Sequence, residues 1–276
     1  NAAFANCNSL ETLQFSDGSM LETVEDSCFY ADSSLKTMQL PKSVTSIGEF
    51  AYTLSGLQSA EISEDVTNIG AAAFGACYDL KELVVNENNT VYASLDNVLF
   101  NKENTVVYCV PSGRKGVYSL PETVHTMAPY SFYHNQYLKL VSLPESLQEI
   151  QNDAFSYCTS LQKVVIPDSV TSIGRYAFAW CYALNSVSFG ENSQLKRLGM
   201  DSFVGCGFSE ITIPASVEEM AQYVFENCYS LRSITFAKGS KLSEITAYMF
   251  TNTTVENIVF EAGSQLKSLQ AHALDG

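Results

Sequence analysis

Large apolar residues return along this chain at a nearly constant interval, and residues 169–189 (SVTSIGRYAFAWCYALNSVSF) show the unit most clearly. One slot of the unit holds an aromatic residue, with Leu274 in the last copy: Phe4, Phe29, Tyr52, Phe74, Phe132, Phe155, Phe178, Phe203, Phe225 and Phe250. Successive copies recur about every 23 residues, except for one much longer interval between Phe74 and Phe132. A period of this length predicts a solenoid, in which each coil buries its apolar edge against the next coil.

Each unit also predicts a short strand. Leu161, Val164 and Ile166 end in Pro167, and the spacing of two between Val164 and Ile166 is typical of a strand with one side buried. The proline cannot donate to a further ladder bond, so the strand is expected to stop there. Stacked coils would align these strands into a parallel sheet along one side of the solenoid.

The rest of the unit predicts turns. An apolar anchor stands five positions before the aromatic slot: Val24, Ile47, Ile69, Met127, Ile150, Ile173, Leu198, Met220, Ile245 and Leu269. From Ile173 onward, the spacings of Ala177, Phe178 and Cys181 favour a helical or 3₁₀ turn. Glycine follows several anchors, as Gly174 follows Ile173, and we expect a bend there that uses permissive backbone angles.

The long interval contains an insertion, residues 86–117, and not a second domain. Val98–Phe100 and Thr105–Val110 are β-prone runs joined by NKEN, which predicts a hairpin. The basic turn PSGRKG follows, and Tyr118, Leu120 and Pro121 restore the strand register. The chain is therefore expected to be a single solenoid over 1–276, of about eleven coils. Because both ends fall inside a repeat and solenoids need capped ends, we expect a longer native protein.

Net charge and hydropathy argue against two kinds of partner, nucleic acid and the interior of a membrane. The net charge of −15 argues against nucleic acid, which requires a basic stripe. No apolar run approaches the 18 or so residues of a membrane span, so no transmembrane segment is expected in this chain.

Six of the eight cysteines share the slot three residues after the aromatic: Cys7, Cys77, Cys158, Cys181, Cys206 and Cys228. This slot also accepts Asp, Ser, Asn and Thr, so we interpret it as a ladder of buried thiols that help to satisfy turn backbone groups. Disulfides between adjacent coils, such as Cys158 with Cys181, remain an alternative. CxxC-like clustering is absent, and no metal site or cofactor is expected.

Catalytic chemistry has no support in the sequence. His125, His134 and His272 occupy variable repeat positions, and no local motif supplies a nucleophile with a base and an orienting group. We therefore expect a protein that is not an enzyme.

The unit resembles the BspA-like leucine-rich repeats, a class with a 23-residue repeat. The segment IPDSVTSIGRYAFAWCYAL (166–184) matches the IP and IGxxAFxxCxxL signature, and LPKSVTSIGEFAY (40–52) and IPASVEEMAQYVFENCYSL (213–231) match it with small substitutions. Departures are local: Tyr52 replaces Phe in the aromatic slot, and Asp32, Ser55, Asn135 and Thr253 replace Cys.

The resemblance covers nearly the whole chain and implies an α/β solenoid: a right-handed curved leucine-rich-repeat coil with a parallel sheet on one face, short helical or 3₁₀ turns opposite, and one β-hairpin insertion. It also implies a bacterial cell-surface or secreted protein that adheres to host extracellular or plasma proteins such as fibronectin and fibrinogen, or to neighbouring cells.

The resulting prediction is a protein-binding scaffold whose ligand docks on the insertion or on the outward row of the strands. The candidate row consists of Glu61, Glu82, Val84, Leu140, Ser142, Lys163, Val165, Ser188, Glu210, Thr212, Thr235 and Val259. Its valines and Leu140 would be apolar and exposed, which is unexpected unless a partner covers them.

Two alternatives remain open. The first is a carbohydrate-binding module that uses exposed tyrosines and Trp180 as stacking platforms, because tyrosines recur two residues before and four residues after the aromatic slot. The second is a structural spacer without a ligand. The sequence does not determine the oligomeric state.

Overall fold

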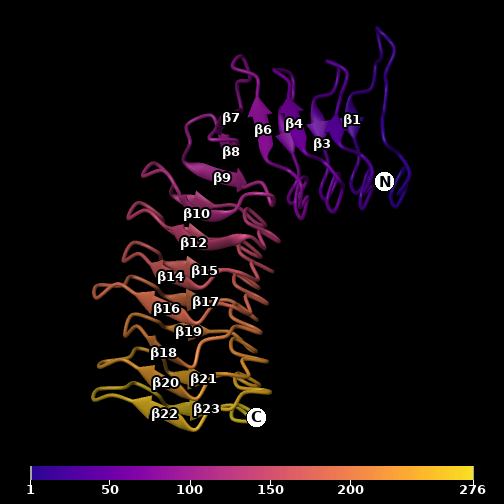
Figure 1. Ribbon diagram of the computed structural model, residues 1–276. Coiled ribbons are helices and arrows are strands. Elements are labelled where there is room, and N and C mark those ends of the chain that lie inside the picture. The colour runs from indigo at the N-terminus through magenta and orange to yellow at the C-terminus, as the bar shows by residue number, and fades with distance from the viewer. Residues whose placement is uncertain (1, 276) are drawn as a thin grey trace. The chain divides into compact units, whose positions relative to one another are not determined.

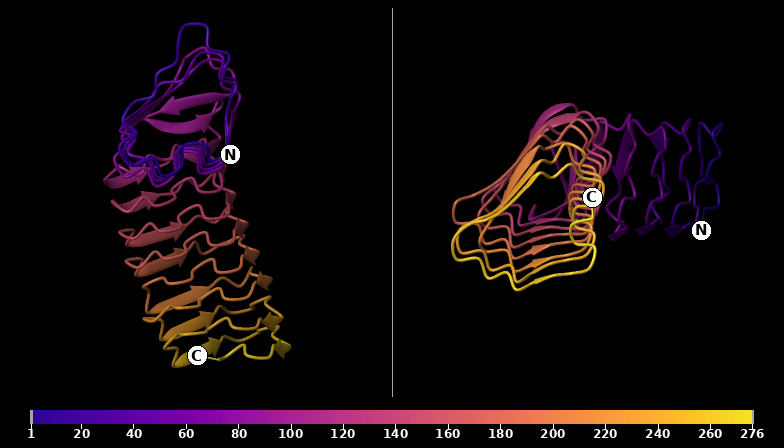
Figure 2. Two further views of the ribbon diagram at one scale, coloured as in Figure 1. Left: turned by 90° about the vertical axis from the view of Figure 1, so that its right-hand side faces the viewer. Right: turned by 90° about the horizontal axis from the view of Figure 1, so that it is seen from below.

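The computed structural model describes residues 2–275, which form two compact units (Figure 1). Among these residues, the first unit comprises 2–114 with Ala128–Asn135, and the second comprises Lys115–Met127 with 136–275. Both units consist of stacked coils, as the repeat period predicts. In the right-hand view of Figure 2, the coils of the second unit lie one behind another.

Two parallel sheets line the coils of the first unit. The longer strands pair in the order β2–β4–β6 and have the bounds Thr37–Met38, Ser59–Ile62 and Glu82–Val85. The shorter strands pair in the order β1–β3–β5 and have the bounds Thr23–Val24, Ser46–Ile47 and Asn68–Ile69.

The second unit repeats this arrangement. Its long strands form the sheets β10–β12–β14–β16 and β18–β20–β22, with the bounds Gly116–Ser119, Leu138–Ser142, Lys163–Ile166, Ser186–Phe189, Glu210–Ile213, Ser233–Phe236 and Asn257–Phe260. Its short strands pair in the orders β11–β13–β15–β17–β19 and β21–β23, with the bounds Thr126–Met127, Glu149–Ile150, Ser172–Ile173, Arg197–Leu198, Glu219–Met220, Glu244–Ile245 and Ser268–Leu269.

The aromatic slot forms the predicted file of stacked rings. In the second unit, the ring of Phe178 lies 5.0 Å from that of Phe155 and 5.2 Å from that of Phe203, measured between centroids, with the planes within 11° of parallel. In the first unit, Phe29 stacks on Tyr52 at 5.0 Å. These rings are buried, so each coil shields the apolar edge of its neighbour.

The prediction of helical or 3₁₀ turns is wrong. Residues 2–275 contain no helix, and the segments around the aromatic slot are consecutive hydrogen-bonded turns. Alternate amides in this segment point in different directions: Phe155 N donates to Ala177 O of the next coil at 2.7 Å, whereas Ser156 N donates within its own coil to Asp153 O at 3.1 Å. A helix would direct all of these amides along its own axis.

Left-handed residues make this alternation possible. Tyr176 and Trp180 have φ values of 55° and 59°, and most coils repeat the pair of positive φ angles four residues apart. The coil therefore has three sides: a long strand, a short strand and a row of turns. The anchor residues expected in the turns lie instead on the short strands, where Ile150, Ile173 and Leu198 are register partners.

The prediction for the glycine after the anchor also needs correction. Gly174 does not have a positive φ, and a Cβ built on it would lie 2.6 Å from the backbone nitrogen of Asn152 in the preceding coil. Glycine is needed at this position because two backbones approach closely, and not because the turn requires permissive angles.

The insertion contains the predicted hairpin and one further strand. Strand β8 (Val98–Asn101) pairs antiparallel with β9 (Val106–Cys109), which confirms the hairpin. Strand β7 (Tyr92–Leu95) also pairs antiparallel with β8, across a turn in which Asp96 and Asn97 both have positive φ. The two residues before 118 lie in β10, so the inserted segment ends earlier than 117.

Candidate binding surface

The strand face, defined as the outward side chains of the long strands, has the alternation that the sequence predicts. In β14, Val164 and Ile166 are buried whereas Lys163 and Val165 are exposed. None of the twelve predicted face residues belongs to the core, although Ser188 and Thr235 are only half-exposed. Nine of the twelve belong to the second unit, and Glu61, Glu82 and Val84 belong to the first.

Register brings some of these residues together. In the first unit, Glu61 is the partner of Val84, and Glu82 is the partner of Ser59. In the second unit, Leu140 is the partner of Lys163, and Val165 is the partner of Ser188. A separate row joins Thr212, Thr235 and Val259, because the sheet is interrupted between β16 and β18.

The strand face of the second unit has one apolar member that the sequence interpretation missed. Val117 is 62% exposed and is the register partner of Leu140. The sequence interpretation places Val117 in the insertion, although its position directly before Tyr118, where the strand register resumes, is the signal that identifies it as an outward residue. Val117, Leu140 and Val165 thus expose apolar surface on β10, β12 and β14.

A groove crosses the strand face where corners of unequal length meet. After β16 and β20 the chain runs FGENSQL (189–195) and FAKGSKL (236–242), whereas after β18 it runs IPASV (213–217). Each stretch ends at a buried aliphatic residue, so the two longer corners project further than the short corner between them.

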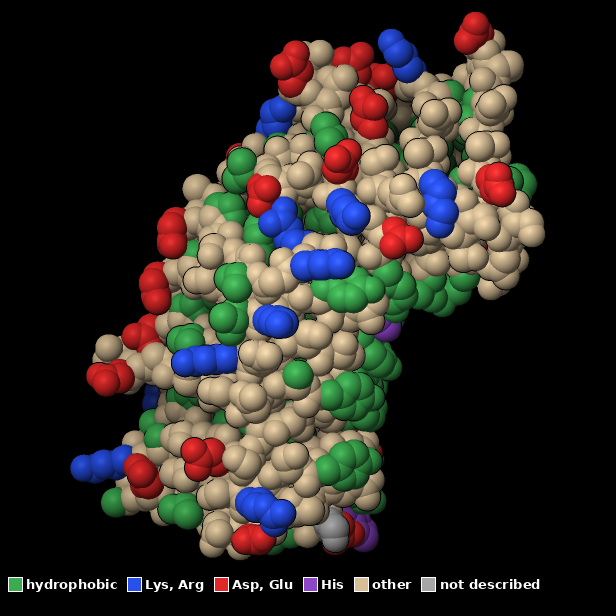
Figure 3. Space-filling view, viewed as in Figure 1, with side chains coloured by type: hydrophobic (Ala, Val, Ile, Leu, Met, Phe, Trp, Pro, Cys, Tyr) green, Lys and Arg blue, Asp and Glu red, His purple; other side chains and the backbone are tan. Residues whose placement is uncertain are grey.

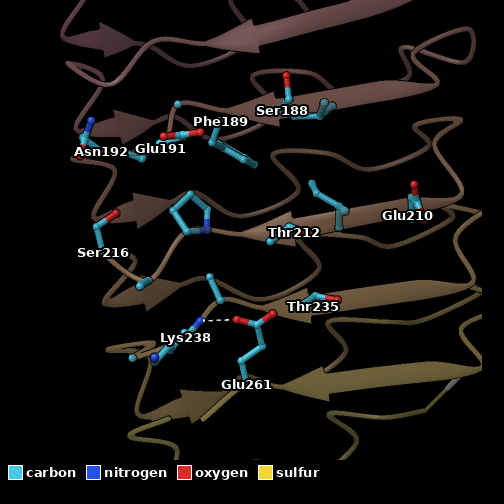
Figure 4. Close-up of a pocket in the computed structure, with 18 of the residues that line it drawn as sticks. Ser188, Phe189, Glu191, Asn192, Glu210, Thr212, Ser216, Thr235, Lys238 and Glu261 are labelled. Atoms are coloured by element: carbon cyan, nitrogen blue, oxygen red, sulfur yellow. Dashed lines mark hydrogen bonds between the residues drawn. The ribbon is translucent and has the colours of Figure 1, made fainter. Parts of the chain in front are cut away.

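The groove has a volume of about 970 Å³. Figure 4 shows Glu191 and Asn192 on one side, Lys238 and Glu261 on the other, and Ser216 between them. The backbone nitrogen of Lys238 donates to the carboxylate of Glu261 at 2.8 Å, which joins two neighbouring corners.

The lining of the groove is polar. The hydroxyl groups of Ser188, Thr212 and Thr235 and the carboxylate of Glu210 face a hollow that is open to solvent. Pockets for small molecules are mostly apolar and enclosed. This groove is better suited to an extended polar chain than to a sequestered small molecule.

The cysteine slot forms the predicted ladder of buried thiols from Cys77 onward, whereas Cys7 in the first coil is exposed and the prediction is wrong for it. The thiol of Cys181 donates to the carbonyl of Phe155 at 3.1 Å, and the thiols of Cys206 and Cys228 contact the carbonyls of Phe178 and Phe203 at the same distance. All eight cysteines are free thiols. Burial raises the pKa of Cys228 to about 12 and that of Cys77 to about 11, so these thiols stay protonated and are poor nucleophiles at neutral pH.

The histidines at the variable repeat positions differ in their surroundings. His134 is half-buried, its Nδ1 lies 3.0 Å from the hydroxyl of Tyr78, and burial lowers its pKa to about 4. His272 stacks on Tyr248 at 5.2 Å. Across residues 2–275, no group of three or more His, Cys, Asp or Glu side chains is placed to hold a metal ion.

The tyrosines on the turn side of the coils divide into stacked rings and exposed rings. Tyr223 and Tyr248 stack at 5.3 Å, which is lateral packing between coils. Tyr182 and Tyr229 are 58% and 64% exposed, so their rings are available for contact.

The coils, the parallel strands and the buried aromatic file define a leucine-rich repeat protein, and comparisons with known proteins identify its family. The model of the BspA type leucine rich repeat region matches residues 1–106, 117–194 and 148–276 in six copies. The chain therefore belongs to the BspA-type leucine-rich repeat family. A comparison with curated protein sequences gave no match.

Solved structures share the fold. A leucine-rich repeat protein from Eubacterium ventriosum matches with a TM-score of 0.78 at 21% identity, over 92% of this chain and 80% of that one. A leucine rich cell surface protein from Faecalibacterium prausnitzii matches with a TM-score of 0.68 at 30% identity, over 94% of this chain and 62% of that one.

The pneumococcal vaccine antigen PcpA matches with a TM-score of 0.62 at 25% identity, again over 94% of this chain and 62% of that one. The chain thus spans less than two thirds of the length of these last two relatives. Among residues 2–275 there is no helix of a length and hydropathy suited to crossing a membrane.

Proposed function

We propose that this chain is a non-enzymatic scaffold that binds a protein ligand through its strand face, at the surface of a bacterial cell or in its secreted fraction. The ligand class that the family resemblance implies is a host extracellular matrix or plasma protein, or a protein of a neighbouring cell. The polar groove beside the short corner Pro214–Ser216 lies on the same face and extends the available contact area.

One observation carries the proposal: aliphatic side chains stand half-exposed on the outward side of the long strands. Val165 is 50% exposed beside Ser188, and Leu140 is 40% exposed beside Val117 and Lys163. Exposed apolar surface on a regular sheet costs solvation free energy, and a partner that covers it recovers about 25 cal/mol per Å².

The location at the cell surface rests on relatives. One similar structure is named as a cell surface protein and another as a vaccine antigen. Both names describe those proteins, and they support export of this chain as part of the proposal.

The adhesive role is tested by biolayer interferometry, which measures the binding of purified fibronectin and fibrinogen to the immobilised full chain. The variant Lys163→Glu with Glu210→Lys leaves the net charge unchanged and reverses two charges of the strand face. We expect it to weaken binding about tenfold, which corresponds to about 1.4 kcal/mol. Lys267→Glu with Glu149→Lys is the matched control, because both residues are exposed and lie off the strand face.

Absence of binding to both proteins would reject adhesion to them and favour the spacer. Equal binding by the two charge-swapped variants would reject the strand face as the contact surface.

A carbohydrate-binding role has one observation in its favour, the exposed rings of Tyr182 and Tyr229 on the turn side. A glycan array probed with the full chain tests it. The expected result for this alternative is a hit that disappears in the double variant Tyr182→Ala with Tyr229→Ala, and an array without hits would reject it.

A further inference from the structure

Three exposed lysines and three exposed aliphatic residues lie on the strands β10, β12 and β14 of the second unit or, for Lys115, directly before β10. We call this the basic-apolar patch, and it consists of Lys115, Lys139, Lys163, Val117, Leu140 and Val165. Val117 and Leu140 are register partners, as are Leu140 and Lys163, so two aliphatic side chains and one lysine lie in one row across neighbouring strands. Figure 3 shows blue and green side chains interspersed over the region of β10, β12 and β14, with the red side chains of this region toward its left-hand edge.

The charge of this patch is opposite to that of the chain. The chain carries 30 acidic and 15 basic residues, yet β10, β12 and β14 contain no Asp or Glu. Other long strands do carry acids at outward positions, such as Glu210 in β18 and Glu82 in β6. The patch is therefore a local exception on an acidic protein.

The lysines of the patch form no ion pair within the part of the chain that the structure describes. Among residues 2–275, Arg114, Arg197, Arg232 and Lys241 each lie within 4.0 Å of an acidic oxygen, whereas no such pair involves Lys139 or Lys163. Lys115 lies over the ring of Tyr137, with its Nζ 5.2 Å from the centroid. This cation–π contact places the ring of Tyr137 beside the patch and leaves the positive charge of Lys115 without an acidic partner among the described residues.

From this combination we infer that the basic-apolar patch docks an acidic segment of a partner protein, in which carboxylates and apolar side chains are interspersed. The inference rests on the proposed protein-binding function and specifies the chemistry of the partner. Carboxylates would pair with Lys139 and Lys163, and apolar side chains would cover Val117, Leu140 and Val165. Charge complementarity would also speed association and discriminate against acid-free partners.

Other polyanions fit the patch less well. Nucleic acid and anionic membranes present dense negative charge, which the net charge of −15 on the whole chain repels, and three lysines make a short stripe. A sulfated glycan would pair with the lysines but leave the aliphatic side chains uncovered. A protein segment satisfies both halves of the surface.

Selection of phage-displayed peptides on the full chain tests the inference. We expect enriched peptides with net negative charge and interspersed apolar residues. Their affinity for Lys139→Glu with Lys163→Glu should fall at least about tenfold relative to wild type, and raising NaCl from low to high concentration should weaken binding. Lys196→Glu with Lys267→Glu makes the same change in net charge at exposed sites off the strand face and should leave the affinity within about twofold.

The apolar half of the patch has its own variants. Val117→Thr with Val165→Thr keeps β-branched side chains and removes apolar surface, and we expect roughly fivefold weaker binding. Val84→Thr with Val259→Thr is the matched control, because these valines are 45% and 43% exposed on other strands.

The outcomes separate the two claims. Selected peptides that are neutral or basic, or that ignore the Lys139 and Lys163 changes, would overturn the acidic partner and leave protein binding standing. Failure to select any peptide that binds the folded chain would count against protein binding itself. Heparin or phosphatidylserine vesicles that bind in a manner dependent on Lys139 and Lys163, and that are insensitive to the valine changes, would overturn the choice of a protein partner.

Discussion

The turn side and the strand face of the second unit differ in what restricts their sequences. On the turn side, Phe155, Phe178 and Phe203 recur because each ring must stack on the next, and the thiol of Cys181 recurs because it meets a carbonyl of the preceding coil. On the strand face, the outward positions hold lysine, leucine, valine, serine, threonine and glutamate, and no single residue type occupies one of these positions throughout the coils. Regularity along the chain therefore marks the residues that packing restricts, and irregularity marks the residues that packing leaves free to vary.

The largest expected effect tests the scaffold. Phe178→Ala removes a fully buried ring that stacks on two neighbours, and we expect a loss of about 3–5 kcal/mol in the free energy of unfolding. Urea denaturation followed by circular dichroism measures it. Tyr182→Ala, at a 58% exposed ring on the same side, should change stability by less than about 1 kcal/mol. Equal losses for the two variants would contradict the division into buried file and exposed row.

The next effect tests the close approach of neighbouring coils. Gly174→Ala places a Cβ 2.6 Å from the backbone nitrogen of Asn152, and because backbone must move, we expect a loss of about 3 kcal/mol by the same measurement. Gly239→Ala is the comparison, since Gly239 has a φ of +77° but no atom within 4 Å of the added Cβ. Strain in the backbone angle alone should cost about 1 kcal/mol. A larger loss at Gly239 would mean that backbone angles, and not coil spacing, select the glycines.

A smaller effect concerns the thiol ladder at high pH. The folded pKa of Cys228 is raised to about 12 from an ordinary value of 9.0, so the unfolded chain loses this proton first as the pH rises. Stability contributed by the protonated thiol is complete below pH 9 and is lost between pH 9 and 12, at about 1.4 kcal/mol per pH unit.

Cys228→Ser keeps a donor toward Phe203 but removes the titration. Urea midpoints at pH 8 and pH 10 should therefore fall less for this variant than for wild type. The same fall in both proteins would contradict burial of the thiol in its protonated form.

The smallest effect lies on the strand face. Val165→Thr changes a half-exposed side chain to another β-branched one, and stability should change by less than about 0.5 kcal/mol. Thermal unfolding measures the change. A loss comparable to that of Gly174→Ala would show that Val165 belongs to the core, and its exposure could then not be explained by a partner.

Sequence alone determined the period, the buried positions and the hairpin of the insertion. Those features follow from local chemistry, because the aromatic slot and the alternating strand can each be recognised within one repeat. The thiol ladder was also accessible, since one slot held six of the eight cysteines.

Only the tertiary structure decided how the turns and the surface are built. Alternate amides such as that of Phe155 bond to the neighbouring coil, a whole repeat away in the sequence, and this long-range partner favours left-handed turns over the helix that the local spacing favours. The groove arises where the corner 213–217 lies between two longer corners, and the basic-apolar patch arises where Val117, Leu140 and Lys163 fall in register. Both depend on which coils are neighbours and how their lengths compare, which no single repeat specifies.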